Sequence, residues 1–256
     1  MDRVVELKNV TMNYHTLDGE TQAIKNLSLD IRKGEFVSIV GPSGCGKSTL
    51  LSLISGLIKT STGEILINNE PVDGPSTNVG YMPQRDHLFE WRTILKNTTI
   101  GLEIQNKLNR ETLRNAERLL EEYGLGEFKS YYPKQLSGGM RQRAALIRTL
   151  AANPEILLLD EPFSALDYQT RLAISEEIWL IIKKEKKTAV LVTHDIAEAV
   201  SMSDRVIVLT KRPAEVKSEH SIELTTGSCR TPIICREAPE FRVYFNKIWK
   251  ELDVHV

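Results

Sequence analysis

The sequence predicts an α/β fold in which helices cover a mainly parallel core sheet. The first observation is a set of short apolar runs, each ending in a polar turn. Because the runs are continuous rather than alternating, they indicate strands buried on both faces, as in a parallel sheet. The second observation is that helical patterns lie between the runs, which favours strand–helix alternation. The predicted strands are Phe36–Val40, Val79–Met82, Ile156–Leu159 and Ala189–Val192.

Three helices are predicted between these strands. Lys47–Leu57 follows a glycine-rich loop, and Met140–Ala152 stops at Asn153-Pro154, where proline cannot continue a helix. Arg171–Lys184 repeats apolar residues at helical spacing. Each helix is therefore placed as a connection between core strands.

Two regions depart from this core pattern. Short β-like pieces in residues 3–35 and 63–72 predict an antiparallel β flank. In residues 86–135 apolar side chains recur at three- and four-residue spacing, and Gly124 stands where a helix would stop. This region is predicted to be a helical subdomain inserted into the α/β core.

The chain ends in a further amphipathic stretch, whose apolar face is formed by Phe241, Tyr244, Phe245, Ile248, Trp249 and Leu252. We therefore predict one large domain over residues 1–225 and a C-terminal helical tail over residues 226–256. Within the domain, the core covers about residues 1–85 and 145–210, and the helical subdomain covers about residues 86–144.

Charge and hydropathy exclude several function classes. The 256 residues hold 33 basic and 34 acidic side chains, a net charge of −1, so no nucleic-acid partner is expected. Apolar runs such as Trp179–Ile182 are far shorter than the roughly 18 residues of a spanning helix, and no signal segment opens the chain. We expect a cytoplasmic protein with reduced cysteines, for which any membrane role comes through a partner.

The glycine-rich loop matches the Walker A pattern and predicts a phosphate-binding site. Its glycines let successive N–H groups wrap phosphates; Lys47 would pair with the β- and γ-phosphates, Ser48 would bind Mg²⁺, and Thr49 would contact the α-phosphate. The alternative is an ordinary glycine-rich turn, which the position between a strand and a helix disfavours. The loop consists of Gly41, Pro42, Ser43, Gly44, Cys45, Gly46, Lys47, Ser48 and Thr49.

Polar residues follow the other predicted strands, at the edge where parallel sheets bind ligands. Asp160 suits the Mg²⁺ shell and Glu161 suits a base for the attacking water, although paired acids there could merely cap a helix. His194 could hydrogen-bond a γ-phosphate, whereas a lone histidine is more often structural. Gln84 could bind Mg²⁺ or the water, and Tyr14 could stack on adenine; an ordinary turn residue is the alternative for both.

The segment Leu136–Arg143 places Ser137, Gly138 and Gly139 directly before a helical pattern. The N–H groups and positive dipole end of that helix can face an anion. Because the chain already has a complete phosphate loop, this second anion site suits a nucleotide bound mainly by another copy of the protein.

Together these motifs resemble an ABC (ATP-binding-cassette) ATPase of the P-loop NTPase class over nearly the whole chain. The resemblance implies ATP and Mg²⁺ as cofactors and a head-to-tail homodimer, in which residues 137–139 of one copy face the γ-phosphate held by Lys47 of the other. Asp167, in the loop 164–167, would then lie at the dimer seam. Glu161 and His194 are both intact, which implies a cassette that hydrolyses ATP and couples hydrolysis to dimer closure.

The segment from Gln84 to Ile94, with Asn97 and Gly101–Glu103 downstream, resembles importer cassettes for nitrate, sulfonate, taurine and thiamine precursors. Phe89-Glu90 departs from the leucine-proline pair common there. The resemblance implies a transmembrane permease partner at the inner face of the membrane and, indirectly, an extracytoplasmic substrate-binding protein. Leu88, Phe89 and Trp91 are either permease contacts or internal packing. Soluble and exporter-type ABC ATPases are the alternatives; the chain lacks the second cassette or long coiled coil of the soluble types.

Overall fold

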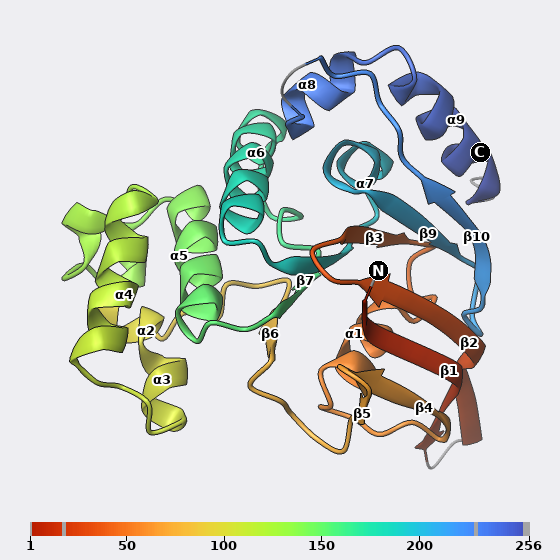
Figure 1. Cartoon of the computed structure of the whole chain (residues 1–256), viewed down its shortest axis with the longest axis horizontal. Helices are drawn as coiled ribbons and strands as arrows, with labels where there is room; N and C mark the ends of the chain where they lie inside the picture. Colours follow the sequence, from red (N-terminus) through yellow and green to blue (C-terminus); the bar gives the residue numbers. More distant parts are fainter. Residues whose placement is uncertain (1, 17–18, 228–229, 253–256) are drawn as a thin grey trace.

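The computed structural model describes residues 2–16, 19–227 and 230–252 (Figure 1). In this part of the chain the strands form two sheets. The larger sheet has six strands in the order β10-β9-β3-β8-β7-β6, and the smaller has four in the order β2-β1-β4-β5. The larger sheet comprises β3 (Phe36–Val40), β6 (Val79–Met82), β7 (Ile156–Asp160), β8 (Thr188–Val192), β9 (Arg205–Leu209) and β10 (Val216–Ser221).

The larger sheet confirms the predicted mainly parallel core. Strands β6, β7, β8, β3 and β9 pair in parallel, and only the edge strand β10 runs antiparallel to its neighbour among the described strands. Leu157 and Leu159 of β7 enter one apolar cluster, while Ile156 and Leu158 enter another on the opposite face. Both faces are covered, which is why the strand sequences read as continuous apolar runs.

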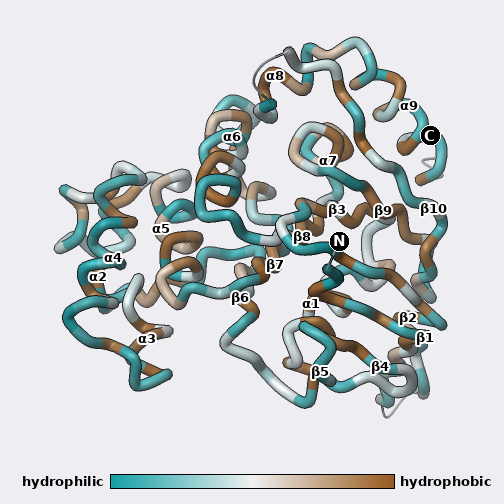
Figure 2. The backbone as a smooth tube through the Cα atoms, in the orientation of Figure 1, coloured by the Kyte–Doolittle hydropathy of each residue, from teal (hydrophilic) through white to brown (hydrophobic). Residues whose placement is uncertain are grey.

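The smaller sheet is the predicted antiparallel flank, and it is more extensive than the short pieces in the sequence suggest. It contains β1 (Arg3–Thr16), β2 (Gly19–Arg32), β4 (Thr62–Ile67) and β5 (Glu70–Pro71). Helix α1 (Lys47–Ile54) lies between the two sheets (Figure 1). Its buried Leu50 and Leu51 share an apolar cluster with Val37 of β3 and Val5 of β1. The brown segments of Figure 2 mark this inter-sheet layer.

The inserted region is helical, as predicted. It contains α2 (Ile94–Thr98), α3 (Ile100–Ile104), α4 (Arg110–Glu122) and α5 (Gly138–Ala151). The Asn109 side chain caps α4, and the chain leaves this helix through Gly124, whose φ of 74° suits glycine. Because α5 is one continuous helix, the predicted boundary at residues 144–145 falls inside a single element.

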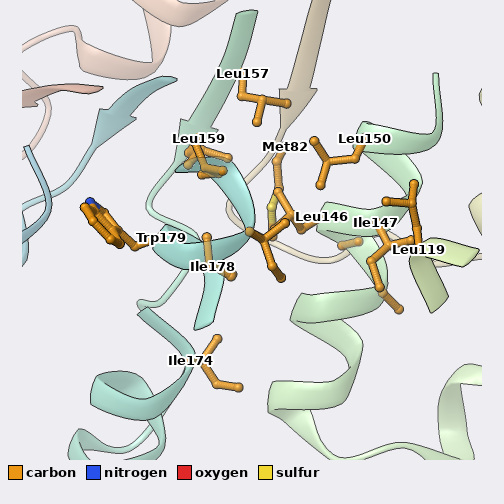
Figure 3. Packing of buried hydrophobic residues seen from close by; sticks show 14 of the residues in the cluster. Met82, Leu119, Leu146, Ile147, Leu150, Leu157, Leu159, Ile174, Ile178 and Trp179 are labelled. Atoms are coloured by element: carbon orange, nitrogen blue, oxygen red, sulfur yellow. The ribbon is translucent and has the colours of Figure 1, made fainter. Parts of the chain in front are cut away.

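Helix α5 packs between the inserted helices and the core sheet. Figure 3 shows Leu146, Ile147 and Leu150 of α5 facing Met82 of β6, with Leu119 of α4 beyond them. Gly80 permits a close approach, because a Cβ there would lie only 2.5 Å from Cγ2 of Thr149 on α5. The strand that leads to Gln84 is therefore held directly against α5.

The remaining helices lie around the core sheet and include the tail. They are α6 (Tyr168–Lys184), α7 (Ile196–Met202), α8 (Pro232–Glu237) and α9 (Phe241–Glu251). Ile248 of α9 is fully buried in a cluster with Val40, Val206 and Val208 of the core sheet. The predicted tail thus packs against the domain (Figure 1). Within the described residues, none of these helices combines the length and apolar character needed to cross a bilayer.

Candidate functional site

The glycine-rich loop connects β3 to α1, as the sequence predicts. Gly44 has φ of 71° and Gly46 has φ of 125°, conformations that favour glycine; a Cβ at Gly46 would also lie 3.0 Å from the Ala23 carbonyl oxygen. Lys47 is buried, and its Nζ donates to the carbonyl oxygens of Gly41 at 2.8 Å and Pro42 at 3.1 Å. The loop therefore folds around the ammonium group of Lys47.

A pocket of about 370 Å³ opens beside this loop, and it joins residues from three separate chain segments. Its walls are Ser43, Gly44, Gly46, Lys47, Ser48, Thr49, Gln84 and Glu161. Next to it, the Tyr14 hydroxyl lies 3.2 Å from the Thr49 hydroxyl oxygen. Cys45 points away from solvent at 1% exposure, and burial raises the pKa of its thiol. Only the backbone of Cys45 is thus available to a nucleotide.

Asp160 ends β7 as a buried carboxylate beside α1. Its Oδ1 accepts a hydrogen bond from the Ser48 hydroxyl at 3.1 Å, and its Oδ2 accepts one from the Tyr81 hydroxyl at 3.0 Å. Burial raises the pKa of Asp160, and these two hydrogen bonds oppose the rise. Tyr81 was not among the predicted site residues; its position on β6, the strand paired with β7, is the signal that could have revealed it.

Glu161 follows Asp160 and is held in an unusual conformation. Its φ of 44° lies in the left-handed region, which non-glycine residues rarely adopt, and its N–H donates to the Val192 carbonyl at 2.8 Å. Its Oε2 accepts a hydrogen bond from Gln84 Nε2 at 3.2 Å and lies 3.1 Å from His194 Nδ1. Gln84 also donates to the Ser164 hydroxyl at 3.2 Å, a contact that the motifs did not predict.

The donor set beside the loop fits a nucleotide with a hard divalent cation. Ser48 and Asp160 place a hydroxyl and a carboxylate oxygen 3.1 Å apart, and Gln84 adds an amide group at the same pocket. Oxygen ligands of this kind are those that Mg²⁺ prefers. Lys47 supplies the positive charge that a phosphate needs, so the residues present suit both cofactors.

Ser137, Gly138 and Gly139 lie elsewhere, at the start of α5. The Ser137 hydroxyl accepts from the Met140 N–H at 3.3 Å and caps the helix. These three residues do not line the pocket beside Lys47, and α5 lies apart from α1 in Figure 1. Asp167 similarly caps α6, and hydrogen bonds from the Thr170 N–H and hydroxyl lower its pKa. The fold therefore does not bring the Ser137 segment to the phosphate loop of its own chain.

Comparisons with known proteins agree with this geometry. Residues 24–164 match the family model of the ABC transporter. The chain is 45% identical over 249 residues to the ABC transporter ATP-binding protein YtlC of Bacillus subtilis (strain 168), covering 97% of this chain and 95% of that protein. It is 42% identical over 234 residues to the nitrate import ATP-binding protein NrtD of Synechocystis sp. (strain ATCC 27184 / PCC 6803 / Kazusa), covering 90% and 88%.

Among solved structures, it is similar to the dimeric post-hydrolysis state of the ATP-binding cassette MJ0796 bound to ADP and Pi. The TM-score is 0.74 at 37% identity, covering 86% of this chain and 99% of that one. The family match spans more than half of the chain, and a neighbour of the same fold is captured with the products of hydrolysis. The chain therefore belongs to the ABC transporter family, as an ATP-binding subunit that hydrolyses ATP.

Proposed function

We propose that the chain energises an ABC importer for a small anionic or organic solute, of the nitrate, sulfonate, taurine or thiamine-precursor type. Two copies would bind head to tail, with ATP binding closing the dimer and hydrolysis reopening it. The nitrate import protein among the relatives and the dimeric state of MJ0796 support this proposal. The segment from Gln84 to Glu103, with its resemblance to such importers, supports the same solute class.

The observation that carries the hydrolytic role is the carboxylate of Glu161, fixed between the Gln84 amide and the His194 imidazole. A carboxylate held by two neighbours at the wall of a phosphate pocket suits a general base that orients and deprotonates water. Gln84 then helps to place that water, and His194 hydrogen-bonds the terminal phosphate. Both neighbours hold the carboxylate before substrate arrives, so little reorganisation is required.

The phosphate loop and Asp160 would hold the cofactors. Residues 41–49 give N–H groups and the Lys47 ammonium to the phosphates, with Thr49 at the α-phosphate and Tyr14 against adenine. Ser48, Asp160 and Gln84 would bind Mg²⁺, which when bound neutralises phosphate charge. The hydrogen bond between Ser48 and Asp160 keeps these two oxygens together.

Ser137, Gly138 and Gly139 would complete the site of a second copy. Their helix α5 has 14 residues, so its first turn offers N–H groups and a developed positive dipole end to an anion. Within one chain the segment does not line the phosphate pocket, so a partner site is the simplest use for it. Asp167, exposed at the start of α6, would lie at the same seam.

A permease would bind the loop that carries Trp91. This side chain is 75% exposed and contacts Phe89, with ring centroids 5.1 Å apart. The buried Asn97 holds the loop by donating to the carbonyls of Phe89, Arg92 and Thr93. Leu88 is buried, so it belongs to the internal packing rather than to the free surface. Through this loop the chain would sit at the inner face of the membrane, beneath a permease served by an extracytoplasmic binding protein.

The hydrolytic role is tested with Glu161→Gln in the full chain. This variant should bind ATP with unchanged affinity, hydrolyse it at least about 100-fold more slowly, and form an ATP-dependent dimer that is stable in size-exclusion chromatography. Glu64→Gln, an exposed acid on β4, is the matched control and should behave as wild type. Near-normal turnover in Glu161→Gln would refute the general-base role.

The solute class is tested through the binding protein that accompanies the permease. A thermal-shift screen with nitrate, taurine, an alkanesulfonate and a thiamine precursor should give stabilisation by one of them, because a ligand stabilises the fold to which it binds. Stabilisation by sugars or amino acids alone would overturn the proposed class.

A further inference from the structure

A buried polar cluster adjoins the loop that carries His194. Glu198 of α7 is 3% exposed, and its Oε2 accepts a hydrogen bond from the Thr193 hydroxyl at 2.7 Å. The same hydroxyl accepts from the Asp195 N–H at 3.0 Å. Thr193 and Asp195, the neighbours of His194 in the chain, are therefore held by a chain of hydrogen bonds that leads to the buried carboxylate of Glu198.

Arg171 joins this cluster to a second loop. Its Nη2 donates to the Leu166 carbonyl at 2.9 Å, while its Nη1 donates to Asp195 Oδ2 at 3.4 Å. Its Nε forms an ion pair with Glu198 Oε1 at 3.9 Å. Leu166 directly precedes Asp167, the predicted seam residue. One guanidinium thus spans from the 164–167 loop to Asp195, which follows His194, and to the buried Glu198.

The cluster is not optimised for hydrogen bonding, although it is largely buried. The Nε of Arg171 is shielded from solvent and has no hydrogen-bond partner within the described residues. A buried donor without a partner weakens the folded state. The planar fork of arginine can hold two loops in a fixed mutual geometry, which a flexible lysine cannot do.

We propose that Arg171 and Glu198 are positioning residues that fix the placement of His194 relative to the 164–167 loop. When a second copy binds against this loop, the same contacts then place the His194 imidazole beside Glu161. The inference rests on the proposed function, because it requires the seam role of Asp167 and the catalytic role of His194. Neither Arg171 nor Glu198 lines the phosphate pocket, so both act through the loops.

The test compares Arg171→Met and Glu198→Met with wild type in the full chain. Both variants should lower kcat for ATP by about tenfold or more while KM and ATP affinity stay unchanged, because only the geometry of His194 is lost. The double variant should be no slower than the slower single variant, since the two residues form one link. Arg171→Lys, which keeps the positive charge but lacks the planar fork, should lower kcat as Arg171→Met does.

Arg230→Met is the matched control. Arg230 also binds a carboxylate, that of Asp204 at 3.1 Å, and a backbone carbonyl, that of Ser203, and its Nε is likewise buried without a hydrogen-bond partner among the described residues. It lies at the opposite end of α7 from His194. Its replacement should lower the melting temperature without a selective loss of kcat.

Three outcomes would overturn the inference: unchanged kcat in both Met variants, losses of kcat that only parallel lost ATP binding, or additive losses in the double variant. If Arg171→Met does not fold, Glu198→Met with Arg171→Lys decides the matter by the same criteria. Glu161→Gln, assayed in the same experiment, distinguishes a failure of the proposed function from a failure of this inference. Normal turnover in it refutes the proposed function, whereas slow turnover with wild-type kcat in the Met variants refutes this inference alone.

Discussion

The Nδ1 atom of His194 lies 3.1 Å from Oε2 of Glu161, the same oxygen that accepts a hydrogen bond from Gln84. Three residues from the ends of three different core strands therefore meet at one carboxylate oxygen. The predicted apolar runs Val79–Met82, Ile156–Leu159 and Ala189–Val192 are the strands that deliver them.

Replacement of His194 by alanine should slow hydrolysis by about 100-fold or more with little loss of ATP binding, because Lys47 and the rest of the phosphate loop still hold the phosphates. Steady-state turnover and binding of a fluorescent ATP analogue measure the two effects. His87→Ala, a change at an exposed loop histidine, serves as the control for the isolated chain. Parallel losses of affinity and turnover would show instead that His194 serves nucleotide binding.

Glu161→Gly should be more stable than Glu161→Ala by about 1 kcal/mol, although both lose turnover. The φ of 44° at this position strains any residue with a Cβ, and glycine removes the strain. Urea unfolding of the two variants gives the difference directly. Equal stability, or a more stable alanine variant, would mean that the backbone is not strained here.

Two inactive variants should partly restore hydrolysis when they are mixed. Ser137→Arg blocks the helix start that is proposed to face a partner site, and Lys47→Ala removes the ammonium of the phosphate loop. A mixed dimer keeps one intact site if Ser137 acts in trans, and none if it acts in cis. Ser137 also caps α5, so its replacement lowers the stability of the fold by about 1 kcal/mol. Asn109→Ala removes the cap of α4 and is the control for this loss of stability.

Glu198→Gln should flatten the dependence of stability on pH. Burial raises the pKa of Glu198 to about 7, which the Thr193 hydrogen bond opposes. The folded state therefore holds this proton more tightly than the unfolded state. The stabilisation is complete below pH 4.5 and is lost as the pH rises through 7, by an amount on the order of 3 kcal/mol. Unfolding free energies of wild type and variant from pH 5 to 8 should diverge accordingly, with Glu64→Gln tracking wild type.

Trp91→Ala should reduce both co-purification with the permease and its stimulation of ATP turnover. Trp249→Ala on α9 is the control, since Trp249 is also exposed, at 44%, but lies far along the chain on the tail helix. Pull-down and turnover with the permease reconstituted in vesicles provide the measurement. Equal effects of the two substitutions would show that the permease does not bind at the Trp91 loop.

The sequence predicted the elements whose pattern is local. Strand β3 coincides with the predicted run Phe36–Val40, and α4 ends where Gly124 indicated. Strand β10 was not predicted, because its residues, Val216–Ser221, are mostly polar and lie at a sheet edge, with no apolar run to mark them. Strand β9 was not predicted either, although Arg205–Leu209 shows the same apolar signal as the other core strands.

The candidate site was predictable where a motif fixes the spacing. The phosphate loop is one contiguous segment, and Asp160 and Glu161 are neighbours at the end of one apolar run, so local patterns locate both. Tyr81 was not predicted, although its place on a predicted strand beside β7 could have indicated its contact with Asp160. Arg171 was not predictable, because it reaches Asp195 from another helix. Long-range contacts of single polar side chains leave no periodic trace in a sequence.

The buried position of Ile248 has a practical consequence for handling the protein. Deletion of residues 226–256 would uncover Val40, Val206 and Val208, which α9 and α7 cover in the intact chain. A contiguous apolar patch of this kind promotes self-association. A shortened cassette would therefore precipitate or form soluble aggregates at concentrations where the full chain stays dispersed, even though every residue of the phosphate pocket would still be present.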